Sequence, residues 1–118
     1  MNEDIDYMIK LYKTTDLDWM GDKINNPCDL TRHHIIKKQY NGEDSISNYA
    51  LLTTYSHHLI HYFEIHYNKE YNMLNDLFIE LNKSKKEPTK EYYENVLLII
   101  KRIKKDMKNK RRNNSKKR

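Results

Sequence analysis

The chain has 118 residues, which is enough for one domain with a modest hydrophobic core. Its single cysteine excludes both an intrachain disulfide framework and a zinc site built from cysteine ligands, and favours a reducing, cytoplasmic environment. No apolar run approaches the roughly 20 residues that cross a bilayer, and the acidic start is unlike a secretory signal, so we expect no membrane partner.

The formal net charge of +5 is unevenly distributed along the chain. Residues 101–118 hold eleven lysines or arginines and one acidic residue, whereas the first 100 residues have a net charge of −5. Such a basic block is typical either of contact with polyanions such as nucleic acid or of a disordered, solubilising tail. We predict one domain over residues 1–107 and a basic, disordered tail over residues 108–118.

The first half of the chain predicts a helix followed by two strands. Apolar residues at helical spacing favour a short helix over about residues 4–13. The β-branched residues within 30–38 favour a strand, and a second short strand is expected over residues 49–54. The segment between these strands is polar and contains Asn41-Gly42, a dipeptide typical of turns.

The second half of the chain predicts helices. Ser56 is the expected N-cap of a helix that starts at His57, and helical spacing continues beyond a break near Asn72. Thr89 is the expected cap of the last helix, which carries one apolar stripe formed by Tyr92, Val96, Ile99, Ile100, Ile103 and Met107. This order indicates an α+β fold, with a short two-stranded antiparallel hairpin and a helix flanked by an N-terminal helix and long C-terminal helices.

Five of the six histidines fall between positions 33 and 61. His57 and His61 are four residues apart on the predicted helix, so both imidazoles lie on one face, where two can bind one metal ion. His33 and His34 are neighbours on the predicted strand, so their side chains point to opposite faces. One of them can therefore join a metal site while the other has a different role. Taken alone, each histidine pair is usually incidental. The interpretation as a metal site therefore depends on the spacing of both pairs together.

The stretch from Thr31 to Phe63 resembles the ββα-metal signature of the HNH endonuclease family. That signature contains His-His-Ile on a strand, a loop with glycine, Ser-Asn before Leu-Leu on a second strand, and a helix that opens with His-x-x-x-His. The corresponding residues are His33-His34-Ile35, Gly42, Ser47-Asn48, Leu51-Leu52, His57 and His61. The chain lacks the two CxxC pairs that hold a structural zinc in many members, so flanking helices must support the motif core over residues 30–66.

The resemblance implies a metal-dependent endonuclease that hydrolyses phosphodiester bonds in DNA, with RNA left open. It implies that His33, His57 and His61 bind one divalent metal ion. It further implies that His34 is the general base and that Asn48 supports this base and braces the strands. The family often works with Mg²⁺ or Mn²⁺, whereas imidazole ligands suit Zn²⁺ or Ni²⁺ better, so the metal stays open. Small size and this resemblance favour a phage or mobile-element origin.

Basic residues supply the expected contacts with DNA phosphates. We expect these contacts from residues beside the His-His pair and in the tail, namely Arg32, Lys37, Lys38, Lys110, Arg111 and Arg112. His58 has no role in the signature and is expected to be exposed, as is His66. Two other interpretations stay open: a non-catalytic, metal-stabilised module that binds nucleic acid or protein, and a helical interaction protein whose histidines are incidental.

Overall fold

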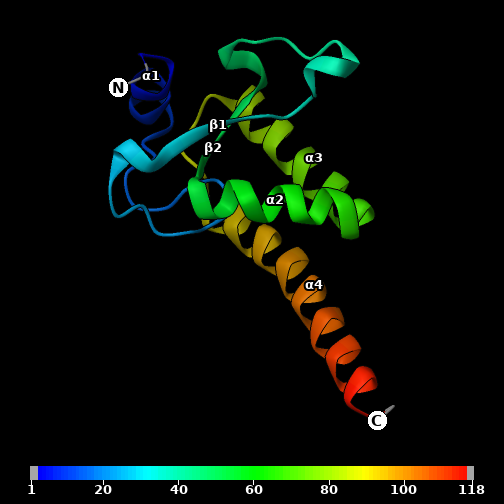
Figure 1. Ribbon diagram of the computed structural model, residues 1–118. Helices are drawn as coiled ribbons and strands as arrows, with labels where there is room; N and C mark the ends of the chain where they lie inside the picture. Colours follow the sequence, from blue (N-terminus) through cyan, green and yellow to red (C-terminus); the bar gives the residue numbers. More distant parts are fainter. Residues whose placement is uncertain (1–2, 117–118) are drawn as a thin grey trace.

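The computed structural model describes residues 3–116, with side chains as far as Arg111, and it has an α+β fold (Figure 1). In this range a two-stranded antiparallel hairpin is combined with four helices. The elements are α1 (Glu3–Tyr12), β1 (Leu30–His34), β2 (Tyr49–Thr53), α2 (Thr54–His66), α3 (Asn68–Ser84) and α4 (Lys90–Lys116). The expected class, with a hairpin between an N-terminal helix and longer C-terminal helices, is confirmed. None of the helices in this range is both long and apolar enough to span a bilayer.

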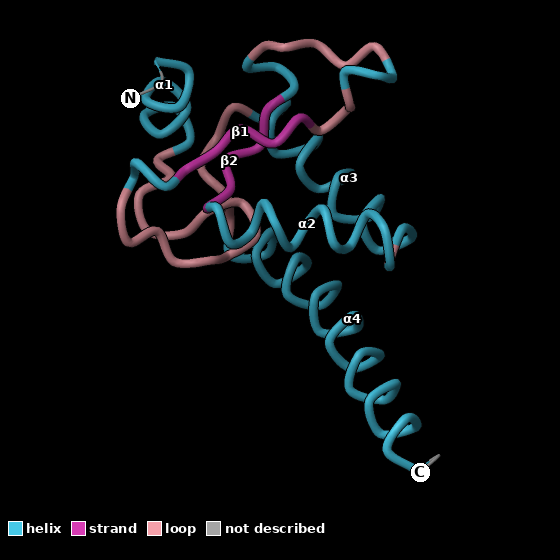
Figure 2. The backbone as a smooth tube through the Cα atoms, in the orientation of Figure 1, coloured by secondary structure: helices cyan, strands magenta, loops and turns pink. Residues whose placement is uncertain are grey.

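The hairpin lies at the centre of the molecule, between long loops and the helices (Figure 2). Its register pairs His33 with Ala50 and His34 with Tyr49. Every residue of β2 is buried, whereas β1 buries only Leu30 and His33. One of the two buried positions of β1 is thus occupied by a histidine rather than by an apolar side chain.

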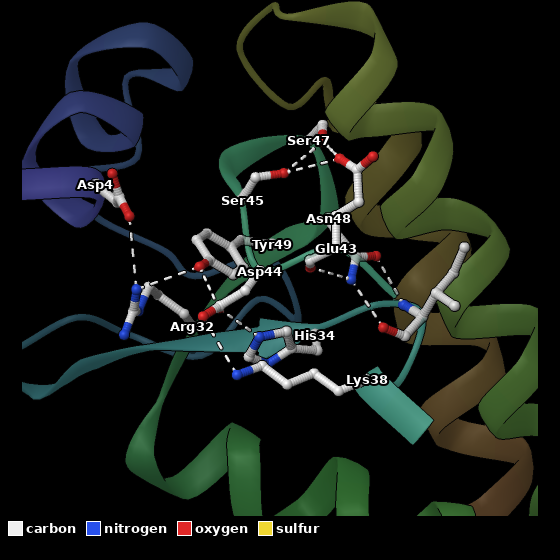
Figure 3. Close-up of polar contacts among 11 residues, drawn as sticks. Asp4, Arg32, His34, Lys38, Glu43, Asp44, Ser45, Ser47, Asn48 and Tyr49 are labelled. Atoms are coloured by element: carbon white, nitrogen blue, oxygen red, sulfur yellow. Dashed lines mark hydrogen bonds and ion pairs between the residues drawn. The ribbon is translucent and has the colours of Figure 1, made fainter. Parts of the chain in front are cut away.

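The loop between the strands is held by the side chain of Asn48 (Figure 3). Its amide oxygen accepts the Ile36 N–H at 2.8 Å, and its amide nitrogen donates to the carbonyl oxygens of Ile36 and Glu43 at 2.8 and 2.9 Å. The strand predicted over residues 30–38 therefore ends at His34, because these side-chain bonds replace a continued pairing. Glycine is required at Gly42, since a Cβ atom there would lie 1.8 Å from the Ile36 carbonyl oxygen.

Helix α2 begins at Thr54, so the predicted start at His57 with Ser56 as the cap was wrong. Thr53 is the N-cap, and its hydroxyl oxygen accepts the Ser56 N–H at 3.2 Å. Two acidic residues of the loop before β1 fix this junction. The buried Asp18 carboxylate accepts the Thr53 N–H at 2.9 Å, and Asp22 accepts the Thr53 hydroxyl at 2.6 Å. The direction in which α2 leaves the hairpin is therefore determined by side chains far away in the sequence.

Helix α3 starts after a break at Tyr67, five residues before the break expected near Asn72. It carries two buried asparagines, Asn75 and Asn82, which are seven residues apart and so lie on one face two turns from each other. Asn82 donates to the carbonyl oxygens of Ile46 and Tyr49, both at 2.8 Å. These polar contacts fix the position of α3 against the hairpin.

Helix α4 extends away from the rest of the molecule towards the C-terminus (Figure 1). Its predicted cap is confirmed, because the Thr89 hydroxyl oxygen accepts the Tyr92 N–H at 3.0 Å. The predicted stripe is buried from Tyr92 to Ile103 and partly buried at Met107. We expected a disordered tail over residues 108–118, whereas α4 continues to Lys116, in keeping with the high helix propensity of lysine and arginine. The last two residues of that tail lie outside the described residues.

Candidate functional site

Three histidines from two elements converge beside the hairpin. His33 comes from β1, and His57 and His61 come from successive turns of α2. One ring nitrogen from each lies within 4.8 Å of the others. The His57 and His61 rings are stacked, with centroids 4.8 Å apart, and the His33 ring stands edge-on to both. The structure thus brings together the three residues that the sequence selected as metal ligands.

The surroundings of His33 and His57 favour neutral imidazoles. His33 is 2% exposed, and burial lowers its pKa to about 4, against a hydrogen bond with Asn75 that acts in the other direction. Burial also lowers the pKa of the half-buried His57, and the neighbouring His61 lowers it further. A neutral ring with a free lone pair is the form in which histidine binds metal ions.

Thr31 determines which nitrogen of His57 is free. The Thr31 hydroxyl donates its only hydrogen to the Leu52 carbonyl oxygen at 2.8 Å. The contact of 2.6 Å between the Thr31 oxygen and His57 Nδ1 must therefore be donated by the ring. This places the proton on Nδ1 and leaves the lone pair on Nε2, the arrangement expected of a histidine ligand with a fixed outer partner.

Asn75 has the same effect on His33. The Asn75 amide nitrogen donates to the Ile35 carbonyl oxygen at 3.2 Å, which directs the amide oxygen towards the ring. That oxygen lies 3.2 Å from His33 Nε2, so the ring donates through Nε2 and keeps its lone pair on Nδ1.

The third histidine has a carboxylate as its outer partner. His61 Nδ1 lies 3.5 Å from a carboxylate oxygen of Glu64, which also forms an ion pair with Lys37. Burial alone would raise the pKa of Glu64, but the Lys37 ammonium holds it below its usual value, so the side chain is an anion that only accepts. All three rings therefore have one nitrogen engaged and one free.

These rings line a pocket of about 220 Å³ that contains other predicted residues. His34 lies in its wall, although it points to the other face of β1 from His33. Three cationic side chains that we expected to contact nucleic acid also line it, namely Arg32, Lys37 and Lys38. A candidate metal centre, a further imidazole and three cations thus share one small opening.

His34 is oriented by Asp44, a residue that we did not predict from the sequence (Figure 3). His34 Nε2 lies 2.9 Å from Asp44 Oδ1, and the same oxygen accepts the Tyr49 hydroxyl at 2.6 Å. The Tyr49 hydroxyl, the His34 ring and the Lys38 ammonium hold the pKa of Asp44 far below its usual value. An anionic Asp44 can only accept, so His34 donates through Nε2 and its lone pair is on Nδ1.

Two cations surround this pair. The Lys38 ammonium lies 3.2 Å from the Asp44 carboxylate. The Arg32 guanidinium lies 5.1 Å from the centroid of the Tyr49 ring and 3.5 Å from an Asp4 carboxylate oxygen. Both side chains remain partly exposed, so they are accessible to a phosphate at the rim of the pocket.

The resemblance assigned two tasks to Asn48, and the structure separates them. Asn48 was expected to brace the strands, and its side chain bonds to Ile36 and Glu43 in the loop that connects them. Its side-chain bonds go to backbone groups, and the polar partner of the His34 ring is Asp44 instead. Any effect of Asn48 on His34 therefore passes through the fold of the loop.

The remaining predicted residues lie elsewhere. Lys110 and Arg111 line a separate pocket between α2 and α4, and the side chain of Arg112 lies outside the described residues. His58 and His66 are exposed, as expected.

Comparisons with models of known protein families, with curated proteins and with solved structures give no match. The likeness to the HNH signature therefore depends on the residues and geometry of this chain.

Proposed function

We propose that this protein is a metal-dependent endonuclease of the ββα-metal (HNH) type that hydrolyses phosphodiester bonds in DNA. One observation carries the proposal: one ring nitrogen from each of His33, His57 and His61 lies within 4.8 Å of the others, and a fourth histidine shares their pocket. In this interpretation β1, β2 and α2 form the ββα-metal core.

The donor set fits a divalent metal ion. His33, His57 and His61 would hold the ion, and only small ring movements would be needed to close the cluster from its present spread of 4.8 Å. Three imidazoles suit Zn²⁺ or Ni²⁺ better than Mg²⁺, which prefers oxygen ligands. A bound ion supplies Lewis-acid chemistry, polarising a phosphate oxygen and offsetting the negative charge that develops as the ester bond breaks.

His34 is the general base of the proposed reaction. Its free Nδ1 takes a proton from a water molecule as the water oxygen bonds to phosphorus and the bond from phosphorus to the 3′ oxygen breaks. The anionic Asp44, 2.9 Å from Nε2, stabilises the imidazolium that forms. The leaving 3′ oxygen takes its proton from solvent, which gives 5′-phosphate and 3′-hydroxyl ends.

Binding of the DNA backbone falls to the cations of the pocket. Arg32 and Lys38 are the partly exposed pair beside His34, and Lys37 lies on the side of His61 through its ion pair with Glu64. Contacts of this kind position the scissile phosphate without reading its sequence.

A plasmid-nicking assay tests the proposal. Supercoiled plasmid is incubated with metal-free protein and Mg²⁺, Mn²⁺, Zn²⁺ or Ni²⁺, using the wild type, His34→Ala and His58→Ala. We expect nicking by the wild type with at least one ion and a loss of about 10²–10⁴-fold in His34→Ala, the usual contribution of a general base. His58→Ala removes an exposed histidine of α2 and should match the wild type. Equal nicking by the wild type and His34→Ala would contradict the proposal.

A second candidate function is a non-catalytic module that a metal ion stabilises. The burial of His33 within the hairpin favours it, because an ion bound there links β1 to α2. It predicts that metal ions raise the melting temperature without any nicking, whereas the endonuclease shows both effects.

A further inference from the structure

A second pocket, of about 330 Å³, lies where α2 meets the C-terminal part of α4. From the α2 side it is lined by Tyr62, His66 and Tyr67, and from α4 by Met107, Lys110 and Arg111. Its volume is at the lower end of the range for small-molecule sites. The lining combines aromatic rings with two cations.

The rings of this pocket are close to one another and partly accessible. The Tyr62 side chain is 40% exposed, and its ring centroid lies 4.5 Å from that of His66 and 6.4 Å from that of Tyr67. Tyr67 is fixed in place, since its hydroxyl donates to Asp106 at 2.9 Å and the Lys110 ammonium lies 5.1 Å from the centre of its ring. Tyr67 and Lys110, which both bond to Asp106, thus form one wall of the pocket next to the partly exposed Tyr62.

Aromatic faces next to lysine and arginine suit a particular ligand. Unpaired nucleobases stack on exposed aromatic rings, while the adjoining phosphates are bound by cations. A base within a duplex offers only its edges, because its faces are covered by its neighbours in the stack. We infer that this pocket binds an unpaired nucleotide of a single-stranded nucleic acid, with the base on Tyr62 and His66 and the phosphate at Lys110 and Arg111.

The inference rests on the proposed function in that it assigns the pocket to the same substrate strand. Tyr62 directly follows the metal-site residue His61, and His66 lies five residues further along α2. At a rise of 1.5 Å per residue, the five residues from His61 to His66 span only about 7.5 Å along α2. A strand whose phosphate occupies the metal pocket thus reaches the second pocket within a few nucleotides, so the preferred substrate has a single-stranded segment beside the cleaved bond.

Equilibrium binding without metal ions tests the inference independently of cleavage. Fluorescence anisotropy is measured with a labelled 12-nucleotide single strand and with the matching duplex, in EDTA, for the wild type, Tyr62→Ala, Tyr62→Phe and Tyr55→Ala. We expect Tyr62→Ala to weaken single-strand binding about tenfold, the usual loss of one stacked base, and to leave duplex binding unchanged. Tyr62→Phe keeps the ring and should bind as the wild type does. Tyr55 is an exposed tyrosine of the same helix outside the pocket, so its loss should have no effect.

Salt dependence separates the phosphate contact from stacking. Lys110→Ala should reduce the slope of log affinity against log salt by about 0.7 for the single strand, whereas Tyr62→Ala should leave the slope unchanged. Equal single-strand affinity of the wild type and Tyr62→Ala, or an equal loss in Tyr62→Ala and Tyr55→Ala, would overturn the inference. Because no cleavage is measured, a failed nicking assay would refute the nuclease without affecting this result.

Discussion

His33 and His34 are neighbours in the chain and lie on opposite sides of β1, in two different environments. His33 is buried against α2 and α3, and its outer nitrogen donates to the neutral amide of Asn75. His34 is partly exposed, and its outer nitrogen donates to the carboxylate of Asp44. Strand β1 therefore carries two histidines. One is buried and has a neutral hydrogen-bond partner, and the other is partly exposed and has an anionic partner.

The different burial and partners of the two histidines suit them to different roles in one candidate site. Burial and a neutral partner favour an uncharged ring with a fixed lone pair, which suits a metal ligand. A carboxylate partner and solvent access stabilise the ring after it gains a proton, which suits a general base. Three predictions test this contrast.

The largest effect is expected from the buried His33, and it concerns how the free energy of unfolding depends on pH. The pKa of His33 is about 4 in the folded protein, against about 6.5 for a histidine in an unfolded chain. As the pH falls below 6.5, the unfolded state gains a proton that the folded state resists, so stability present at neutral pH is lost down to about pH 4. The full loss is about 3 kcal/mol, of which about 2 kcal/mol falls between pH 6.5 and 5.

Urea denaturation of the metal-free protein at pH 7 and pH 5 measures this effect. His58→Gln is the matched control, since His58 is exposed and its replacement should leave the loss unchanged. A free energy of unfolding that stays constant over this interval would show that His33 is not held neutral by the fold.

The next effect concerns the outer partner of His57. Thr31→Val removes the hydroxyl that accepts from His57 Nδ1 while keeping a side chain of similar shape. We expect metal affinity to fall by about 10–100-fold, the usual cost of losing such a partner. Competition with a chelating dye measures the affinity, and Thr54→Val, at the exposed first residue of α2, is the control. If Thr31→Val binds the metal as tightly as the control does, the proposed orientation of His57 is wrong.

The smallest effect is expected at the partly exposed His34 and its partner Asp44. Asp44→Asn should lower the nicking rate about tenfold while leaving metal affinity unchanged, because the neutral amide no longer stabilises the protonated ring. Glu43→Gln changes the neighbouring acid, whose carboxylate bonds to Ser45 and Ser47, and should preserve the nicking rate. An equal nicking rate in Asp44→Asn and Glu43→Gln would count against Asp44 as the positioning residue.

Local sequence patterns account for the elements and for the arrangement of the histidines within each of them, whereas the joining of His33 to the helical pair was implied only by the resemblance. Helical spacing predicts that His57 and His61 share a face, strand alternation predicts that His33 and His34 diverge, and the apolar stripe predicts the buried face of α4. Each of these patterns depends on geometry within one element. Errors arose at element ends, as at α2, where Thr53 is the cap in place of Ser56 because Asp18 and Asp22 fix the junction.

Apart from Glu64, which is three residues from His61 on the same helix, the outer partners of the histidines could not be predicted in the same way. Asp44 is ten residues from His34, Thr31 is 26 residues from His57, and Asn75 is 42 residues from His33. Such contacts depend on how the elements pack. The one available signal was that Asn75 and Asn82 directly follow apolar residues of the buried face of α3. A polar side chain that is buried there needs a polar partner.

Calorimetric titration of the metal-free protein with Zn²⁺ tests the central claim most directly, namely that three imidazoles bind one ion while His34 stays free. We expect one ion per chain for the wild type, an affinity lowered more than about 100-fold in His57→Ala, and an affinity within about twofold of the wild type in His34→Ala. Absence of binding by the wild type, or an equal loss in His57→Ala and His34→Ala, would contradict it.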